Sequence, residues 1–443
     1  MKSMKAKAIY DQYEVNGVIP FSPIMKAFIN EQKTIPKDFV HICTVSVNCE
    51  AAIVRKAISI LVSHHDMLRG IFTDNGIEVI PSDERKAYSF KTITIEDTEK
   101  AREALSNTKL QGDKLVNVVY CKTDKETLVS IAVHHFLIDL ISWEVLAKDL
   151  QTIIRQIENE EKIELPAKTA SFKLWSEKLR EYGATIPEGN RAYWEEINNK
   201  LENAKSFCSN EEENEAEEYS YTFDKDMSEK IINGANAAYG TRTNEILLTA
   251  LGLAAGKLAS GDVGIMVESH GRTEFHKPIA VERTIGWFTS CYPVVIKKNE
   301  NITEELINVK ETMRRIPKNG VEYLLMTEKF HENTDILFNY YKTSLAEEKR
   351  EDNRITFGGT SIFPGKINVN CFAIDGIVTV NISVPKCKHK PQIGEELGKE
   401  FQREIERIVD ICTGTEETVK TRSDFSDNSL TESELNELMD LFG

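Results

Sequence analysis

A chain of 443 residues is too long for one compact hydrophobic core and divides naturally into two units of about 200 residues each. It carries 55 lysines and arginines against 71 aspartates and glutamates, a net charge of −16, which argues against nucleic acids and anionic membrane surfaces because both bind clustered positive charge. No apolar run approaches the roughly 20 residues of a membrane span and residues 1–7 lack the apolar stretch of a signal peptide, so we expect a cytoplasmic protein.

The first half of the chain predicts a mixture of helices and strands. Apolar residues at helical spacing predict a helix over 51–68 and an amphipathic helix over 143–158. Residues 127–133, Thr-Leu-Val-Ser-Ile-Ala-Val, are short, apolar and rich in β-branched side chains, which favours a buried strand. Trp175 and Trp194 fall in further helical segments.

A strongly acidic segment separates the two halves. Six of the eight residues in 211–218 are glutamates, and their self-repulsion predicts an exposed, mobile loop over 203–220. The predicted division is a first lobe at 1–182, a linker with the acidic loop at 183–220, a second lobe at 221–425 and a helical tail at 426–443.

The second half also alternates helices with strands. We expect a buried helix over 244–257 with Asn244 as its cap, a long amphipathic helix over 393–412, and a tail helix over 431–442. The expected strands are 263–267, 293–296, 335–340, 367–374 and 376–384. Both lobes are therefore of the α/β or α+β class. The eight cysteines are scattered without metal-ligand spacing, which favours buried thiols over a metal site.

The segment most informative about function is 133–143, Val-His-His-Phe-Leu-Ile-Asp-Leu-Ile-Ser-Trp. A strand that ends in two histidines sends His134 and His135 to opposite faces, so one can pack in the core while the other acts as a base near neutral pH. Asp139 is better placed for a structural ion pair than for chemistry. An isolated histidine is more often structural, but the complete HHxxxDxxSW spacing favours a functional interpretation.

This motif resembles that of the condensation and epimerization superfamily of nonribosomal peptide synthetases. Condensing members usually have glycine and an aromatic residue after the aspartate, whereas Ser142 and Trp143 follow the order typical of epimerization domains. Other segments resemble the superfamily's motifs in the same order along nearly the whole chain: 21–28, 64–69, 169–179, 267–272 (Val-Glu-Ser-His-Gly-Arg), 283–289 (Arg-Thr-Ile-Gly-Trp-Phe-Thr) and 338–340 (Phe-Asn-Tyr).

The resemblance implies two chloramphenicol-acetyltransferase-like lobes in a V-shaped pseudo-dimer with a central tunnel. It implies an enzyme without an intrinsic cofactor that converts the α-carbon of an aminoacyl or peptidyl thioester from L to D. The thioester would be held on the phosphopantetheine arm of a peptidyl carrier protein, and other synthetase modules would be further partners.

Carried over residue by residue, the resemblance makes His135 and Glu268 the acid/base pair on opposite sides of the tunnel. Asp139 would pair with Arg69 and hold the histidine loop, while Asn339 and Tyr340 would line the tunnel near the thioester. Supporting positions are His134, Ser142, Trp143 and His270, the last expected on the same strand face as Glu268 in a structural role.

The chemistry of inversion agrees with this pair. A proton must leave one face of the α-carbon and another must arrive on the opposite face, so two groups are needed on opposite sides. The enolate also needs stabilisation. Glu268 would have to be partly desolvated, since a raised pKa lets a carboxyl group deliver a proton near neutral pH.

Some residues depart from the superfamily's pattern, and two alternatives stay open. Ser269 replaces a usual glycine, residues 341–343 replace Leu-Gly-Gln, and 317–324 lacks two glycines. The alternatives are a condensation-type domain that uses His135 without an opposing carboxylate, and a degenerate domain that only docks carrier proteins. If the carrier is acidic, we expect docking on an apolar patch or on a local basic patch such as 388–390 or 314–315.

Overall fold

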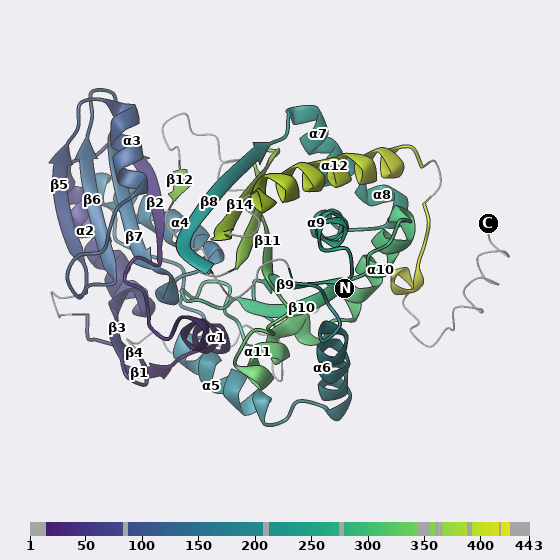
Figure 1. Cartoon of the computed structure of the whole chain (residues 1–443). Helices are drawn as coiled ribbons and strands as arrows, with labels where there is room; N and C mark the ends of the chain where they lie inside the picture. Colours follow the sequence, from purple (N-terminus) through teal and green to yellow (C-terminus); the bar gives the residue numbers. More distant parts are fainter. Residues whose placement is uncertain are drawn as a thin grey trace, which may run out of the picture.

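The structure is a computed structural model of the chain and describes residues 15–82, 87–206, 212–273, 279–343, 355–358, 363, 366–387, 392–415 and 418–425. These residues form two lobes that lie side by side, each built mostly from one half of the chain (Figure 1). No helix in these ranges is both long enough and apolar enough to cross a membrane.

The elements of the first half are β1 Gly17–Pro20, α1 Pro23–Gln32, β2 Val40–Val47, α2 Ala51–His64, η1 Asp66–Arg69, β3 Gly70–Thr73, β4 Gly76–Val79, β5 Ser89–Thr94, α3 Thr98–Ser106, β6 Val116–Lys122, β7 Thr127–His134, η2 His135–Leu137, α4 Leu140–Glu158, α5 Phe172–Gly183 and α6 Glu188–Leu201. Those of the second half are β8 Glu212–Thr222, α7 Lys225–Glu229, η3 Lys230–Gly234, α8 Asn236–Tyr239, α9 Thr243–Ala259, β9 Val263–Ser269, β10 Ser290–Ile296, α10 Ile302–Arg315, η4 Pro317–Gly320, α11 Val321–Thr327, β11 Ile336–Thr343, β12 Ile355–Gly358, β13 Ile367–Ile374, β14 Ile377–Cys387, α12 Ile393–Thr413 and η5 Arg422–Asp424.

The first lobe is built on a five-stranded sheet in the order β12-β2-β7-β6-β5, with a smaller sheet β1-β4-β3 beside it. β7 is a central strand, and nearly all of its residues are buried, as its β-branched sequence predicts. β12 comes from the second half of the chain and pairs antiparallel with β2, with Ile355 opposite Val45. One strand of this sheet is therefore supplied by the other half of the chain.

The second lobe is built on a six-stranded sheet in the order β10-β9-β11-β13-β14-β8. β11 runs parallel to β9 and β13, and the other pairs are antiparallel. Gly394 and Gly398 of α12 lie against Tyr219 and Tyr221 of β8, so α12 covers one face of the sheet. α9 is buried on all sides because it packs against this sheet, α10 and α12.

The cross-strand register assigns the side chains of this sheet to its two faces. One row across the strands consists of Val267, Phe338, Val369, Ile382 and Tyr219. Tyr219 contacts α12, so this row faces the helices and the next residue on each strand faces away from them. On that opposite face Tyr341 of β11 donates a hydrogen bond to Glu144 of α4 at 2.7 Å. The face opposite to α9 and α12 therefore looks toward the first lobe.

Most of the predicted elements are confirmed. The helices expected over 143–158 and 393–412 are α4 and α12, Trp175 and Trp194 lie in α5 and α6, and each expected strand has its counterpart. The helix expected over 51–68 ends at His64 and continues as the short turn η1. Both lobes mix helices and strands, as predicted.

Two predictions are wrong in the second half. The acidic segment is not a mobile loop over its whole length, because residues from Glu212 onward form β8, the edge strand that pairs with β14. Charged residues are well suited to an edge strand because they discourage pairing with other chains. Asn244 is not the cap of α9: the helix begins at Thr243, and Glu245 accepts a hydrogen bond from the backbone of Arg242. The tail helix expected over 431–442 lies outside the described residues.

Candidate functional site

The two motif histidines occupy different environments at the end of β7. His134 is the last residue of the strand and is fully buried. Its Nε2 donates to the carbonyl of Pro36 at 3.0 Å, and its Nδ1 accepts from the backbone N–H of Phe136 at 3.2 Å. Because both ring nitrogens are occupied and burial lowers its pKa to about 4, His134 is a neutral structural residue.

His135 has one nitrogen left for chemistry. Its Nδ1 lies 2.8 Å from the carbonyl of Ile138, and because a carbonyl only accepts, Nδ1 carries the proton of the neutral ring. Nε2 then presents a lone pair, and no residue in the described part of the chain binds it. Burial lowers the pKa of His135 to about 4, outweighing the backbone hydrogen bonds that favour the charged form. The ring is therefore neutral at pH 7, with the lone pair on Nε2 as its proton acceptor.

Aromatic rings hold His135 in place. Its ring centroid lies 4.8 Å from that of Phe39, 3.8 Å from that of His41 and 4.4 Å from that of Trp287. Phe39 and His41 belong to the first half of the chain, whereas Trp287 belongs to the second. The side chain is 8% exposed, so it is enclosed at the junction of the lobes without being sealed from solvent.

Asp139 links the two halves directly. It caps α4 by accepting from the backbone N–H and the hydroxyl of Ser142, both at 2.7 Å. Arg272 donates to its two oxygens at 2.9 and 3.0 Å, and the backbone N–H of Phe288 donates at 3.3 Å. The predicted partner Arg69 is wrong: Arg69 pairs with Asp66 at 3.0 Å, one turn before it in η1. Asp139 instead faces the second half, where Arg272 lies.

Arg272 is a site residue to which the sequence analysis gave no role, although it ends the 267–272 motif. Its guanidinium also donates to the carbonyls of Val281 and Thr284 and lies 4.0 Å from the ring centroid of Phe288. The preceding Gly271 has φ +63°, and a Cβ there would lie 1.7 Å from the carbonyl oxygen of Phe288. Glycine is therefore required for the backbone to bring Arg272 to Asp139.

Ser142 and Trp143, the end of the HHxxxDxxSW motif, are both buried. The Ser142 hydroxyl accepts from Arg272 at 3.0 Å and from the backbone N–H of Gly286 at 3.2 Å. It therefore completes the Asp139–Arg272 junction. Trp143 packs in the hydrophobic core.

Glu268 lies near the end of β9, opposite Cys291 of β10. Its side chain keeps partial exposure, yet it lies deep enough that burial raises its pKa to about 7. No hydrogen bond or ion pair to it is found in the described residues. An unpartnered carboxyl group with this pKa can both release and take up a proton near neutral pH.

His135 and Glu268 reach the lobe junction from separate halves of the chain. His135 contacts Trp287, which lies four residues before Cys291, the cross-strand neighbour of Glu268. Asp139, four residues after His135, pairs with Arg272, four residues after Glu268. Two connections therefore bring the surroundings of both residues together, while no direct bond joins their side chains within the described ranges.

Asn339 and Tyr340 of β11 point to opposite faces of the six-stranded sheet. Asn339 follows Phe338, which is paired with Val267, so on parallel strands Asn339 is the next neighbour of Glu268 and shares its face. Tyr340 points to the opposite face, where its hydroxyl lies beside Thr243 of α9 without a hydrogen bond of normal geometry. Its predicted position beside Asn339 at the thioester is wrong, because side chains alternate along a strand.

His270 lies just beyond the end of β9, not on the strand as expected. Its Nδ1 accepts from the backbone N–H of Arg272 at 3.0 Å, and the residue is exposed. This bond shapes the turn that carries Arg272.

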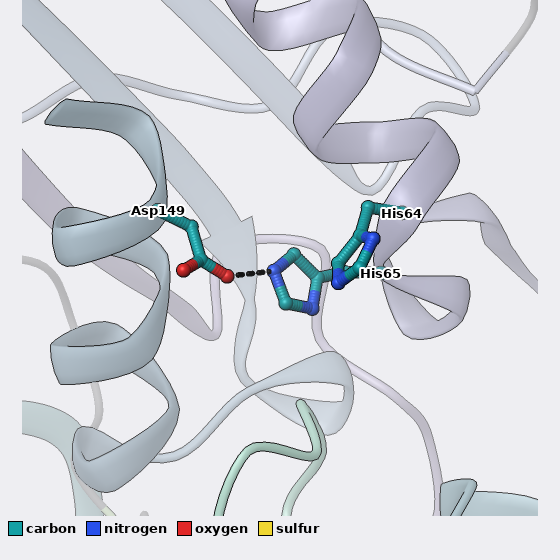
Figure 2. Close-up of side chains that lie close together, drawn as sticks. All are labelled: His64, His65 and Asp149. Atoms are coloured by element: carbon teal, nitrogen blue, oxygen red, sulfur yellow. Dashed lines mark hydrogen bonds and ion pairs between the residues drawn. The ribbon is translucent and has the colours of Figure 1, made fainter. Parts of the chain in front are cut away.

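Three side chains of the metal-ligand type meet where α2 and α4 approach (Figure 2). His64, His65 and Asp149 each bring one ligand atom within 4.8 Å of the others. His65 Nε2 binds Asp149 at 2.9 Å, and Arg283 binds both oxygens of the carboxylate at 2.6 and 2.7 Å. Burial and the neighbouring His65 are the main causes that lower the pKa of His64 to about 4, and the nearby cations Lys168 and Arg283 lower it further. These charges oppose a divalent cation, so the cluster is a second ionic junction between the lobes.

Comparisons with known proteins identify the family. A family model described as the condensation domain matches residues 38–431. The chain belongs to the condensation domain family. Gramicidin S synthase 1 of Brevibacillus brevis is 28% identical over 479 residues, covering 97% of this chain and 43% of that protein. Bacitracin synthase 1 of Bacillus licheniformis is 29% identical over 430 residues, covering 88% of this chain and 8% of that protein. This condensation-family chain thus spans less than half the length of these relatives.

Solved structures share the fold of this condensation-family chain. The epimerization domain from the third module of tyrocidine synthetase B has a TM-score of 0.77 at 25% identity and covers 91% of this chain and 100% of its own. The condensation domain from the Monacolin K polyketide synthase MokA has a TM-score of 0.72, with coverage of 91% and 99%, and at 13% identity it shows the fold alone. The predicted superfamily and fold class are confirmed; the tunnel stays a prediction.

Proposed function

We propose that this condensation-family domain inverts the α-carbon of an aminoacyl or peptidyl thioester held on the phosphopantetheine arm of a carrier protein. The observation that carries the proposal is Glu268: a carboxyl group without a partner among the described residues, whose pKa is raised to about 7 by burial. It lies in the half of the chain opposite to His135, whose Nε2 binds no described residue and carries the lone pair of the neutral ring. The likeness to an epimerization domain supports the same reaction.

The two protonation states allow a balanced reaction. Neutral His135 takes the α-proton through Nε2, which leaves an enolate on the thioester and an imidazolium. Protonated Glu268 then gives its proton to the other face of the α-carbon, which restores the C–H bond with inverted configuration. The low pKa of His135 and the raised pKa of Glu268 favour return of the proton from imidazolium to carboxylate, through solvent, after the product leaves.

Asn339 is the neighbour of Glu268 that can stabilise the enolate. It lies on the same face of the sheet, and its amide is not hydrogen bonded to any described residue. An amide N–H that donates to the thioester oxygen gains strength as negative charge develops on that oxygen. Asn339 therefore supplies the stabilisation that a proton transfer pair alone does not.

The carrier protein is the proposed partner, and 314–315 is one of the two basic patches proposed to bind it. Arg314 is not a free basic patch, because it binds Asp424 at 2.9 Å and the carbonyl of Gly240. Arg315 is exposed, with Glu311 at 3.8 Å, and residues 388–390 lie outside the described ranges. Arg315 is thus the exposed cation of the 314–315 patch, and docking at 388–390 stays a prediction.

Proton exchange tests the proposal. A carrier protein is loaded with defined L-aminoacyl or L-peptidyl groups and incubated with the domain in D₂O, and α-deuterium uptake and the configuration of the released acid are followed. We expect wild-type exchange with inversion, and a loss of about 100-fold or more in both Glu268→Gln and His135→Ala. Glu177→Gln, an exposed glutamate on α5, is the matched control and should keep full activity.

Condensation is the second candidate, favoured by the family model itself and by a His135 base that needs no opposing carboxylate. The same loaded carrier with an amine-bearing acceptor carrier distinguishes the two functions. Amide formation that survives Glu268→Gln, without deuterium uptake, would establish condensation and refute inversion.

A further inference from the structure

A row of polar side chains crosses the six-stranded sheet from Glu268 to the outer strand. Asn370 of β13 is the register partner of Asn339, Asn381 of β14 is the partner of Asn370, and Ser220 of β8 is the partner of Asn381. Glu268 of β9 is the neighbour of Asn339 on the other side. Five consecutive strands thus each place one of these residues on the same face of the sheet. We name Asn339, Asn370, Asn381 and Ser220 the asparagine row.

The asparagine row faces the first lobe, and two of its amides have no hydrogen-bond partner among the described residues. It lies on the face opposite to the row that packs against α12, the same face from which Tyr341 reaches Glu144. Asn339 and Asn370 are partly exposed, and their amides bind no residue in the described ranges. Asn381 accepts from the hydroxyl of Ser220 at 2.8 Å through Oδ1, and its NH₂ group donates to no residue in the described part of the chain.

This arrangement differs from what sheet packing alone requires. The same strands place apolar residues on the helix-covered face, where they are needed for the core. The amides of Asn339 and Asn370 are partly open to solvent and lie side by side on central strands, so together they offer adjacent donors and acceptors to a polar ligand. β8 is the edge strand and Ser220 is exposed, so the row leads from solvent to Glu268. Figure 1 shows β8 between the first lobe and α12.

The chemistry of the row selects the ligand. Each asparagine offers one acceptor and two donors, which matches the C=O and N–H of a secondary amide. Strands are about 4.8 Å apart, so the three steps from Glu268 to Asn381 span about 14 Å, the length of roughly four extended residues. An aminoacyl group alone is too short to reach the far end, whereas a peptidyl chain or the two amides of a pantetheine arm would extend along it.

We infer that Asn370 and Asn381 form a binding subsite for the secondary amides of the carrier-bound substrate, continuing outward from Glu268. The inference rests on the proposed function, because Glu268 fixes the reacting carbon at one end of the row. The amides come either from the peptidyl chain or from the pantetheine arm, and the two sources predict different kinetics.

Exchange kinetics on matched substrates test the subsite. The same carrier is loaded with an L-aminoacyl or an L-tripeptidyl group, and kcat/KM is measured for wild type, Asn370→Ala, Asn381→Ala and the double variant. Each single variant should lower kcat/KM about three- to tenfold. A loss confined to the tripeptidyl substrate assigns the row to the peptide, and an equal loss on both assigns it to the pantetheine arm. Asn199→Ala on α6 is an exposed control and should change neither.

A binding measurement separates the failure of the subsite from the failure of the proposed function. A carrier bearing a stable amide analogue of the tripeptidyl thioester is titrated with each variant, and thermal melts confirm that the variants are folded. Weaker binding by Asn370→Ala and Asn381→Ala, about three- to tenfold, supports the subsite even if wild type shows no exchange. Unchanged binding and unchanged kinetics in folded variants would overturn it.

Discussion

The ion pair between Asp139 and Arg272 joins the two halves of the chain beside the candidate site, and a double-mutant cycle measures its contribution. The side chains of Asp139 and Arg272 are only 8% and 6% exposed. Removal of one partner from a buried pair costs about 3–5 kcal/mol, because the other charge stays buried without compensation. Arg272→Met leaves Asp139 the donors of Ser142 and Phe288, so we expect the lower end, about 3 kcal/mol.

The cycle consists of wild type, Asp139→Asn, Arg272→Met and the double variant, with the free energy of unfolding measured by urea titration followed by tryptophan fluorescence and circular dichroism. Asp139→Asn removes the charge but keeps an acceptor, so the double variant leaves no buried unpaired ion. We expect a coupling energy of about 2 kcal/mol. The exposed pair Arg155–Glu161 is the control, and its coupling should stay below about 1 kcal/mol.

A coupling energy below about 0.5 kcal/mol between Asp139 and Arg272 would refute the argument. Coupling of Asp139 with Arg69 in place of Arg272 would restore the pairing expected from the sequence.

The remaining predictions concern the same junction. Because the folded pKa of Glu268 is about 7, its ionisation at pH 8 costs free energy in the folded state that it does not cost in the unfolded chain. Glu268→Gln removes this cost and should stabilise the fold by up to about 3 kcal/mol at pH 8, and progressively less toward pH 4.5. Equal stabilisation at both pH values in urea titrations would contradict the raised pKa. The ring proton signals of His135 should not titrate between pH 8 and 5.5 in NMR spectra, because burial lowers its pKa to about 4; a midpoint near 6.5 would show an exposed ring. Gly271→Ala should destabilise the fold by about 2 kcal/mol or more and reduce exchange activity, because the new Cβ would collide with the carbonyl oxygen of Phe288. A melting temperature equal to that of wild type would show that the turn is not constrained.

Local patterns predicted most of the fold. The β-branched run of 127–133 and the apolar stripe of 393–412 each reflect the surface that the element buries, so their periodicity was sufficient. The composition of the acidic segment predicts a loop, whereas the alternating residues at its end indicate a strand. Tyr219 and Tyr221 pack against α12 while Ser220 between them faces away, and this alternation is visible in the sequence.

The candidate site was less predictable because it is assembled from distant segments. Motif resemblance pointed to His135 and Glu268 and to the ionic role of Asp139. It could not supply the partner of Asp139, since only the packing of the lobes decides between Arg69 and Arg272. Tyr340 was misplaced although strand alternation alone puts it opposite to Asn339.

The crossing of β12 has a consequence for any attempt to cut this chain in two. A fragment that stops at the predicted end of the first lobe would lack β12 and would expose the full edge of β2, Val40–Val47, whose residues are mostly apolar. Such an edge recruits other chains, so we expect the fragment to aggregate when expressed alone. Any transfer of this domain into another protein therefore has to include both halves of the chain.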